Sequence, residues 1–337
     1  MNVLVTGHQG YVGTILVKQL LEQNFQVLGC DTNYFDSTLS ENSLKIPNLI
    51  SDIRNITNEH LKNIDAIFHL AGLSNDPLGE LNSKLTNEIN YVSTVNLAKR
   101  AKESGVKRFV FSSSCSTYGQ NDNLVDENSS LEPLTEYAKS KVNSEKKILE
   151  LNDENFCVTI LRNATVYGTS SNMRLDLVVN NLLASAFVSG KIELLSDGTS
   201  WRPLLHVNDM ANAFITVLTS SSNLVSGQIF NVGNNDENFT VKQIANTINE
   251  IVPDTEIVYK NIDNKDSRSY KVNFSKISNE LKYKTNWTLK QGIEQLHEYF
   301  SKCNLSKSDF YDFKFHRVHQ LKTLMNNSKL DENLNFI

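Results

Sequence analysis

A tyrosine and a lysine four positions apart, Tyr137 and Lys141, are the side chains of this sequence best suited to move a proton. Residues at this spacing lie one turn apart on the same face of a helix. An isolated phenol has a pKa of about 10, and a fixed ammonium group nearby favours the phenolate. Such a tyrosine can take or give a proton near neutral pH, and a serine hydroxyl can stabilise the resulting alkoxide.

A strand and a helix are expected to position these groups. Pro133 and Thr135 are helix start signals directly before Tyr137. Residues 108–111 have the pattern of a buried strand, and a run of hydroxyl side chains follows at residues 112–117. Polar side chains crowded at the carboxyl end of a strand indicate a site. Taken alone, a serine run also fits a loop that caps helices.

The first residues of the chain predict a phosphate-binding turn. An apolar strand, Val3–Thr6, breaks into the glycine turn Gly7–Gly13 and then opens a helical pattern. This arrangement aims backbone N–H groups and the positive end of a helix dipole at one point. A second strand, Phe25–Cys30, ends at Asp31. An acidic residue about 20 positions beyond the glycines can accept hydrogen bonds from an adenosine ribose and would repel a 2′-phosphate. We therefore predict NAD rather than NADP, with an ordinary βαβ unit and a capping aspartate as the alternative.

Two more strands and a long helix are expected next to this unit. Residues 48–51 and 66–70 have strand patterns, and Ala71-Gly72 allows close approach to the backbone at the sheet edge where ligands bind. Residues 84–104 fit a long helix that carries Asn90. Position alone does not distinguish Asn90 as a site residue from an exposed helix residue.

The composition excludes several classes of protein. The 337 residues suffice for one large or two modest domains, with 39% hydrophobic and 21% charged residues. The net charge of −5 argues against nucleic acid or an anionic membrane as the main partner. Four cysteines without CxxC spacing suggest neither a zinc site nor a disulfide framework. A core strand at the start and the lack of a long apolar run lead us to expect a cytoplasmic protein with no signal peptide, no membrane contact and no metal.

Together these motifs resemble the extended short-chain dehydrogenase/reductase family, in particular its NAD-dependent nucleotide-sugar epimerases, dehydratases and reductases. The resemblance covers about residues 1–300. It is carried by the glycine turn, Asp31, residues 52–53, residues 69–72, the serine-rich strand end, the Tyr137–Lys141 pair, and the segments 161–168 and 197–209.

The resemblance implies an α/β fold, a Rossmann-type doubly wound parallel sheet with a smaller α/β substrate-binding lobe. The NAD-binding domain would comprise residues 1–170, rejoined by about 204–235, and the substrate lobe residues 171–203 and 236–300. Residues 172–181 are expected to begin a helix of that lobe. Residues 301–337 depart from the family pattern and form an aromatic-rich tail, which we expect to pack against the body or a second subunit. A homodimer is implied by the resemblance only.

The resemblance also assigns roles. Tyr137 would be the catalytic acid/base, Lys141 would bind the nicotinamide ribose and lower the pKa of the tyrosine, and Ser114, four residues before Tyr118, would be the hydroxyl partner. NAD binding is implied for Gly7, Gly10, Tyr11, Val12, Gly13, Asp31, Asp52, Ile53, Leu70, Ala71, Gly72, Asn90, Ser112, Tyr137, Lys141 and Asn163. Substrate binding is implied for Ser114, Ser116, Thr165, Arg174, Asn180, Arg202 and Arg268.

The residues after Ser114 bear on the type of reaction. Sugar 4,6-dehydratases of this family typically carry Asp-Glu there, and 3,5-epimerases carry a cysteine two positions after the serine; this sequence has Cys115 and Ser116. What remains is hydride transfer at a sugar carbinol. We predict a 4-epimerase of a UDP-, GDP- or dTDP-linked sugar, with a 4-dehydrogenase or 4-keto-sugar reductase as the alternative. A catalytically silent NAD-binding sensor or scaffold subunit is the alternative from another class.

Overall fold

Parallel pairing of short apolar strands builds the central sheet. The computed structural model describes residues 1–36, 45–74, 82–260 and 268–337, and in these residues seven strands form one sheet in which each neighbouring pair is parallel. In spatial order the strands are β3 (Asn48–Ile50), β2 (Gln26–Asp31), β1 (Asn2–Thr6), β4 (Ala66–His69), β5 (Arg108–Ser114), β7 (Cys157–Asn163) and β11 (Gln228–Val232). The predicted α/β class with a Rossmann-type sheet is confirmed.

The strand order reverses beside β1. The chain runs from β1 outward to β2 and β3, returns to β4 on the other side, and continues through β5 and β7 to β11. In open parallel sheets, ligands bind outside the carboxyl ends of the strands at such a reversal. The last residues of β1, β2, β4 and β5 are Thr6, Asp31, His69 and Ser114, so the predicted site lies at this edge.

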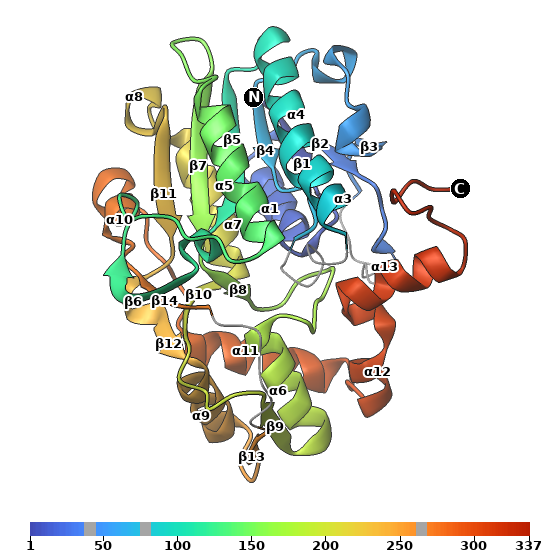
Figure 1. Ribbon diagram of the computed structural model, residues 1–337, viewed down its shortest axis with the longest axis vertical. Helices are drawn as coiled ribbons and strands as arrows, with labels where there is room; N and C mark the ends of the chain where they lie inside the picture. Colours follow the sequence, from blue (N-terminus) through green and yellow to red (C-terminus); the bar gives the residue numbers. More distant parts are fainter. Residues whose placement is uncertain (37–44, 75–81, 261–267) are drawn as a thin grey trace.

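Helices cover both faces of the sheet. Alternate residues of a strand point to opposite faces, and in β1 the side chains of Val3 and Val5 join one apolar cluster while Leu4 joins another. The first cluster lies under α1 and α7, and the second under α4 and α5, which stand in front of the sheet in Figure 1. These helices are α1 (Tyr11–Glu22), α7 (Val207–Thr219), α4 (Ser93–Glu103) and α5 (Glu136–Leu149).

The single helix expected over residues 84–104 is interrupted. A short helix, α3 (Ser83–Asn87), passes into a π-helical turn, Glu88–Val92, before α4 begins. Turns of this kind occur frequently at functional sites. Asn90 lies in the π-helical turn and is buried. The alternative that Asn90 is an exposed helix residue is therefore wrong.

A smaller group of elements, below the sheet in Figure 1, has its own apolar core. It comprises α6 (Val178–Ser189), β9 (Lys191–Leu194), α9 (Val241–Ile251), β13 (Glu256–Tyr259) and α11 (Leu289–Lys302). The expectation that residues 172–181 begin a helix is wrong for their first half, because α6 starts at Val178. The Asn172 side chain and the Leu175 backbone instead bond to other segments of the chain, among them Gln9 and Phe315.

Short strands join the two parts. They are β6 (Gln120–Val125), β8 (Thr165–Tyr167), β10 (Trp201–His206), β12 (Asn238–Thr240) and β14 (Ser269–Val272), with α8 (Ser222–Val225) and α10 (Ser275–Leu281) nearby. Strand β8 pairs with β10, which pairs with β12, and β14 pairs with β6. The prediction that residues 228–232 return to the main sheet is confirmed, since β11 pairs with β7. The division into two domains stays a prediction.

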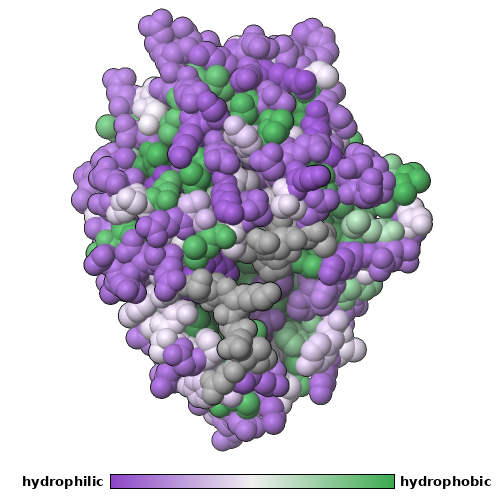
Figure 2. Space-filling view, viewed as in Figure 1, coloured by the Kyte–Doolittle hydropathy of each residue, from purple (hydrophilic) through white to green (hydrophobic). Residues whose placement is uncertain are grey.

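The C-terminal tail runs back from the smaller group to the sheet (Figure 1). It consists of α12 (Lys307–Tyr311), a 3₁₀ turn (Phe313–Phe315), α13 (Arg317–Asn326) and a final turn. Phe310 is buried, as predicted for the tail aromatics, but Tyr311 and Phe313 are exposed. The face drawn in Figure 2 is mostly hydrophilic, with hydrophobic residues at the edge where the chain ends and where Phe336 and Ile337 are exposed. Among the described residues, no helix is long and apolar enough to span a membrane.

Candidate active site

A cavity of about 930 Å³ lies at the carboxyl edge of the sheet, between the sheet and the smaller group of elements. The predicted site residues, all of which the structure describes, line this cavity with two exceptions, Asn90 and Asn180. The glycine turn, Asp31, the serine-rich strand end and the Tyr137–Lys141 pair therefore meet in one place, although they come from separate elements.

The glycine turn leaves no room for side chains. A Cβ atom on Gly13 would lie 2.0 Å from the carbonyl oxygen of Gly7 and 2.7 Å from the Cα of His8. Gly7 has a φ of +73°, and a Cβ there would lie 2.9 Å from the backbone nitrogen of Ala71. Helix α1 follows directly, with Gly10 at its N-cap and no side-chain cap. The first N–H groups of α1 are thus placed as a pyrophosphate requires.

Asp31 ties the glycine turn to the end of β2. Its carboxylate accepts hydrogen bonds from the backbone N–H groups of Gln9 and Asn33, both at 3.0 Å. Asp52, just after β3, accepts from the N–H of Arg54 at 2.8 Å and lines the same cavity beside Ile53. The two carboxylates stand where the sequence predicts the adenosine half of a dinucleotide.

Lys141 is held beside Tyr137 by backbone and burial. Helix α5 starts as predicted, because the Thr135 hydroxyl accepts a hydrogen bond from the N–H of Ala138. The Lys141 Nζ donates to the carbonyl oxygen of Ser112 at 2.7 Å and lies 5.6 Å from the centroid of the Tyr137 ring. Burial lowers the pKa of Lys141 to about 8, against the opposing effect of the Glu145 carboxylate. The amine thus adds positive charge next to the phenol at neutral pH.

The serine-rich strand end offers polar atoms to a ligand. The Ser114 Oγ, at the end of β5, accepts a hydrogen bond from the N–H of Ser116 at 3.1 Å. The Asn163 amide donates to the Ser112 Oγ at 3.2 Å and to the carbonyl oxygen of Ser113 at 3.0 Å. Within the described part of the chain, the Ser116 Oγ and the Asn163 Oδ1 are buried without a hydrogen-bond partner. Since buried polar atoms are normally satisfied, these two cavity-lining residues fit a bound polar group.

A buried ion pair behind the strand end was not foreseen from the sequence. Arg162 on β7 and Glu145 on α5 form a 2.7 Å ion pair, and the Ser113 hydroxyl donates to the Glu145 carboxylate. Arg162 also donates to the Tyr118 hydroxyl at 3.1 Å. These contacts fix the ends of β5 and β7 beneath the cavity. Nothing in the spacing of the three elements along the sequence indicates that they meet.

Asn90 and Asn180 are not among the residues that line the cavity, and the roles predicted for them stay predictions. The Asn90 amide accepts from the N–H of Leu73 at 2.8 Å and donates to the Leu73 carbonyl at 3.0 Å, so it holds the loop after β4. The Asn180 amide accepts from the N–H of Gly168 at 3.1 Å and donates to Tyr11 and to the carbonyl of Arg174. Both amides bond to the protein itself. Next to Asn180 in the chain, Asn181 lines the cavity.

The three predicted arginines line the side of the cavity that faces the smaller group. Arg174 makes a two-bond fork with the Asp176 carboxylate, at 2.9 and 2.8 Å, and donates to the Ser74 hydroxyl at 3.0 Å. Arg202, on β10, donates to the backbone carbonyl of Arg268 at 2.6 Å. The structure thus brings Arg202 and Arg268 together from distant parts of the sequence.

The tail adds cavity-lining residues that sequence reasoning missed. They are Lys307, Phe310, Tyr311 and Arg317. The tail departs from the family pattern, so no motif pointed to these residues. Tyr34 and Phe35, in the loop after β2, also line the cavity and were missed.

The sequence matches a known protein family. The sequence model described as the NAD dependent epimerase/dehydratase family matches residues 3–233, more than half of the chain. YtcB of Bacillus subtilis, described as an uncharacterised UDP-glucose epimerase, is 27% identical over 270 residues, which are 74% of this chain and 82% of YtcB. UDP-glucuronic acid decarboxylase 6 of Arabidopsis thaliana is 27% identical over 320 residues, 89% of each chain.

Solved structures share the fold. MoeE5, in a complex with UDP-glucuronic acid and NAD, superposes with a TM-score of 0.80 at 25% identity, over 90% of this chain and all of that one. The UDP-glucose 4-epimerase of Thermotoga maritima has a TM-score of 0.80 at 24% identity over the same shares, which shows a common fold.

Proposed function

The chain belongs to the NAD-dependent epimerase/dehydratase family, and on that premise we propose that it is a nucleotide-sugar 4-epimerase. As a member of the family it is an enzyme that uses NAD. The observation that carries the proposal is that Tyr137, Lys141 and Ser114 line one cavity together with the glycine turn. A proton-transfer pair at the cofactor cavity serves a reacting carbinol and has no use in a sensor or scaffold.

The residues of the site perform the proton chemistry at C4 of the sugar. NAD, when bound, accepts the hydride and returns it. Tyr137, as phenolate, takes the proton of the C4 hydroxyl, and the phenol gives a proton back when the C4 carbonyl is reduced. Lys141, fixed on the Ser112 carbonyl, stabilises the phenolate by its charge. The Ser114 hydroxyl hydrogen-bonds the C4 oxygen. Inversion follows when the keto sugar presents its other face before reduction.

The residues next to Ser114 support hydride transfer without elimination. Loss of water, or inversion beside the ketone, requires a further acid or base at this place. Cys115 is buried, and its Sγ donates to the Arg162 carbonyl at 3.2 Å. Burial raises the pKa of this thiol far above its ordinary range, so it remains protonated. Ser116 offers a neutral hydroxyl. Neither residue is suited to the additional proton transfer.

The reaction can be assigned by following cofactor and product together. Purified protein with NAD is incubated with UDP-, GDP- and dTDP-linked hexoses and with UDP-glucuronic acid, while absorbance at 340 nm and the NMR spectrum of the sugar are recorded. A 4-epimer without net NADH supports the proposal. Stoichiometric NADH indicates the dehydrogenase or reductase alternative, and a UDP-pentose formed from UDP-glucuronic acid indicates decarboxylation. Tight NAD binding without binding of any nucleotide sugar indicates a sensor.

Tyr137→Phe tests the assigned acid/base. We expect turnover to fall by about 10²- to 10⁴-fold, the usual range for loss of a general acid/base, while the dissociation constant for NAD, measured by calorimetry, stays within about twofold. Tyr259→Phe is the matched control, because Tyr259 lies exposed on β13 and is not one of the residues that line the cavity. Full activity in Tyr137→Phe would refute the chemistry.

A further inference from the structure

The last 31 residues, 307–337, cross from the smaller group to the edge of the sheet at β3 (Figure 1). The start of this crossing lines the cavity, and its end contacts residues that line it. Near its start, Lys307, Phe310, Tyr311 and Arg317 line the cavity. At its end, residues 330–335 pack on the loop that carries Asp52 and Ile53. The proposed chemistry uses none of these tail residues.

Arg317 is buried and is connected to the glycine turn through Asn172. Only 2% of the residue is exposed, and its guanidinium carbon lies 4.2 Å from the centroid of the Phe35 ring. Its Nη2 donates to the Asn172 Oδ1 at 2.5 Å, and the Asn172 Nδ2 donates in turn to the carbonyl of Gln9 at 2.6 Å. Gln9 lies between Gly7 and Gly10, so one residue separates Arg317 from the turn that cradles the pyrophosphate.

A second buried guanidinium group, that of Arg174, lies near enough to Arg317 to act on its charge. Burial, and then the neighbouring Arg174, lower the pKa of Arg317 to about 9, while Asp176 and Asp31 oppose this. The Asp176 carboxylate is engaged by the fork of Arg174, and the Asp31 carboxylate accepts two backbone N–H groups. Two buried guanidinium groups thus line one cavity beside a helix N-terminus. A phosphate oxygen is the partner for which guanidinium geometry is best suited.

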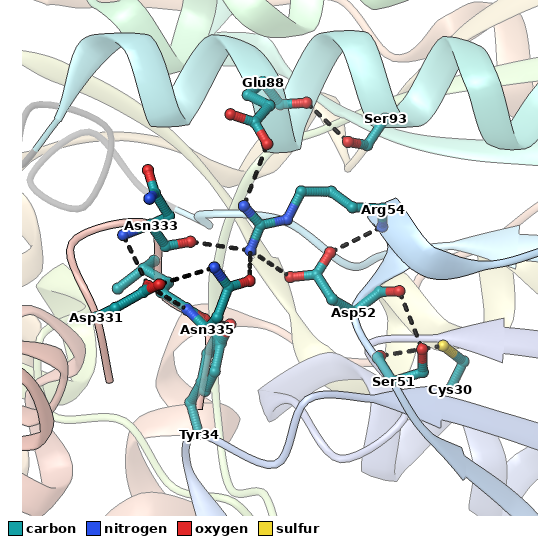
Figure 3. A network of polar contacts seen from close by, with 11 residues as sticks. Cys30, Tyr34, Ser51, Asp52, Arg54, Glu88, Ser93, Asp331, Asn333 and Asn335 are labelled. Atoms are coloured by element: carbon teal, nitrogen blue, oxygen red, sulfur yellow. Dashed lines mark hydrogen bonds and ion pairs between the residues drawn. The ribbon is translucent and has the colours of Figure 1, made fainter. Parts of the chain in front are cut away.

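The final turn is bonded to residues beside the cavity (Figure 3). Arg54, bonded to the Asp52 carboxylate at 2.9 Å, also donates to the carbonyl of Asn333 at 2.9 Å and to the Asn335 Oδ1 at 3.3 Å. The Tyr34 hydroxyl, from a cavity-lining residue, donates to the carbonyl of Leu334. The tail is thereby tied to Tyr34 and, through Arg54, to Asp52, which both line the cavity.

Apolar packing holds this turn in place. Leu330 and Leu334 are 2% and 1% exposed and join a cluster that contains Ile53, Leu73 and Ile89. The Asp331 carboxylate caps the turn by accepting the N–H groups of Asn333 and Asn335 at 2.9 and 2.7 Å. Because its leucines are buried and its turn is capped, this segment is an ordered part of the fold.

We propose that residues 307–337 complete the NAD site, with Arg317 binding the pyrophosphate and the turn at 331–335 closing the adenosine side, so that NAD is retained through many turnovers. The inference rests on the position of the NAD site in the proposed function, but not on which sugar reacts. Retention suits a reaction that returns its hydride, because such an enzyme has no need to exchange the cofactor.

The experiment measures NAD release. The protein is loaded with NAD and passed into NAD-free buffer, and the bound nucleotide is quantified with time for wild type, Arg317→Met and Lys322→Met. Lys322 is the matched control, since it is an exposed cation on the same helix, α13. Loss of a charge-assisted contact predicts release about 10- to 100-fold faster in Arg317→Met. Release at the rate of the Lys322→Met control would overturn the proposal.

Competing ligands locate the contact. ADP carries the pyrophosphate and adenosine does not, so Arg317→Met should weaken ADP by about 10-fold or more and leave adenosine nearly unchanged. If instead UDP binding is weakened and ADP binding is not, Arg317 belongs to the substrate and the proposal fails. Leu334→Ala, which loosens the final turn, should weaken ADP and adenosine alike; unchanged binding of both would refute closure by that turn.

These measurements need no turnover. A protein that retains NAD as predicted but inverts no sugar would contradict the proposed epimerase and leave this inference standing. Thermal unfolding of each variant, followed by circular dichroism without nucleotide, establishes that changes in binding are measured on folded protein.

Discussion

Removal of the Lys141 amine is expected to stabilise the protein while it destroys the site. Burial lowers the pKa of Lys141 from its ordinary 10.5 to about 8, so at neutral pH the fold contains an ammonium group that would be better solvated in the unfolded chain. Methionine has nearly the same length and an apolar end. In the wild type the Lys141 Nζ lies 4.7 Å from the centroid of the Phe111 ring. Lys141→Met therefore keeps the packing of the side chain against this ring.

The magnitude follows from the two pKa values. They differ by about 2.5, which at about 1.4 kcal/mol per unit gives a penalty of about 3 kcal/mol on the folded state. The variant also loses the hydrogen bond to the Ser112 carbonyl, worth about 1 kcal/mol. We expect Lys141→Met to be more stable than wild type by about 2 kcal/mol at pH 7.

The sign of the pH dependence is equally specific. Below pH 8 both the folded and the unfolded wild-type chain carry the proton, and the full penalty applies. Between about pH 8 and 10.5 the unfolded chain still binds the proton that the folded chain has lost, so the wild type becomes more stable relative to the variant as pH rises. The advantage of Lys141→Met should shrink through this range and vanish near pH 10.

Urea unfolding of both proteins without NAD, at several pH values from 7 to 10, measures the difference. Lys147→Met is the control, because Lys147 lies on the same helix but is exposed. The difference in unfolding free energy between Lys147→Met and the wild type should not shrink between about pH 8 and pH 10 as it should for Lys141→Met. A stability difference for Lys141→Met that stays constant from pH 7 to pH 10 would refute the lowered pKa and, with it, the electrostatic argument for the catalytic pair.

Two further predictions follow from buried contacts. Glu145→Gln leaves the Arg162 guanidinium buried without its counter-charge, and we expect a loss of about 3–5 kcal/mol in the free energy of unfolding; the exposed Glu150→Gln should change it by less than about 1 kcal/mol, and equal effects in the two variants would contradict the burial argument. Gly13→Ala places a Cβ 2.0 Å from the Gly7 carbonyl oxygen, so the turn must shift, and calorimetry should show NAD affinity lowered by about 10- to 100-fold. An unchanged dissociation constant would show that the turn tolerates the methyl group.

The strands and the cofactor turn could be predicted because their signals are local. Val3–Thr6 and the glycine turn are contiguous, and the Tyr137–Lys141 spacing is a property of one helix. The prediction failed where an outcome depended on partners elsewhere in the chain. Residues 172–177 are not helical, because Asn172 and Leu175 bond to the glycine turn and to the tail.

Asparagine side chains illustrate the same limit. Asn90 and Asn180 both lie near the site, yet each uses its amide to hold a neighbouring backbone segment. Asn163 does the same with its amide NH₂ group, while its Oδ1 is buried without a partner in the described residues and so fits a ligand. All three residues are asparagines, so the residue type does not separate them, and only the partners that the fold supplies do.

The sequence by itself determined the parallel sheet and placed the glycine turn and the Tyr137–Lys141 pair, since each depends on residues within a few turns or strands of one another. The tertiary structure alone decided which distant segments meet beside the cavity. Tyr34 and Leu334 are 300 positions apart and share a hydrogen bond, and Arg317 reaches the glycine turn through Asn172. Neither contact produces a periodicity or a motif spacing in the sequence, because both depend on how the end of the chain folds back toward its first strand.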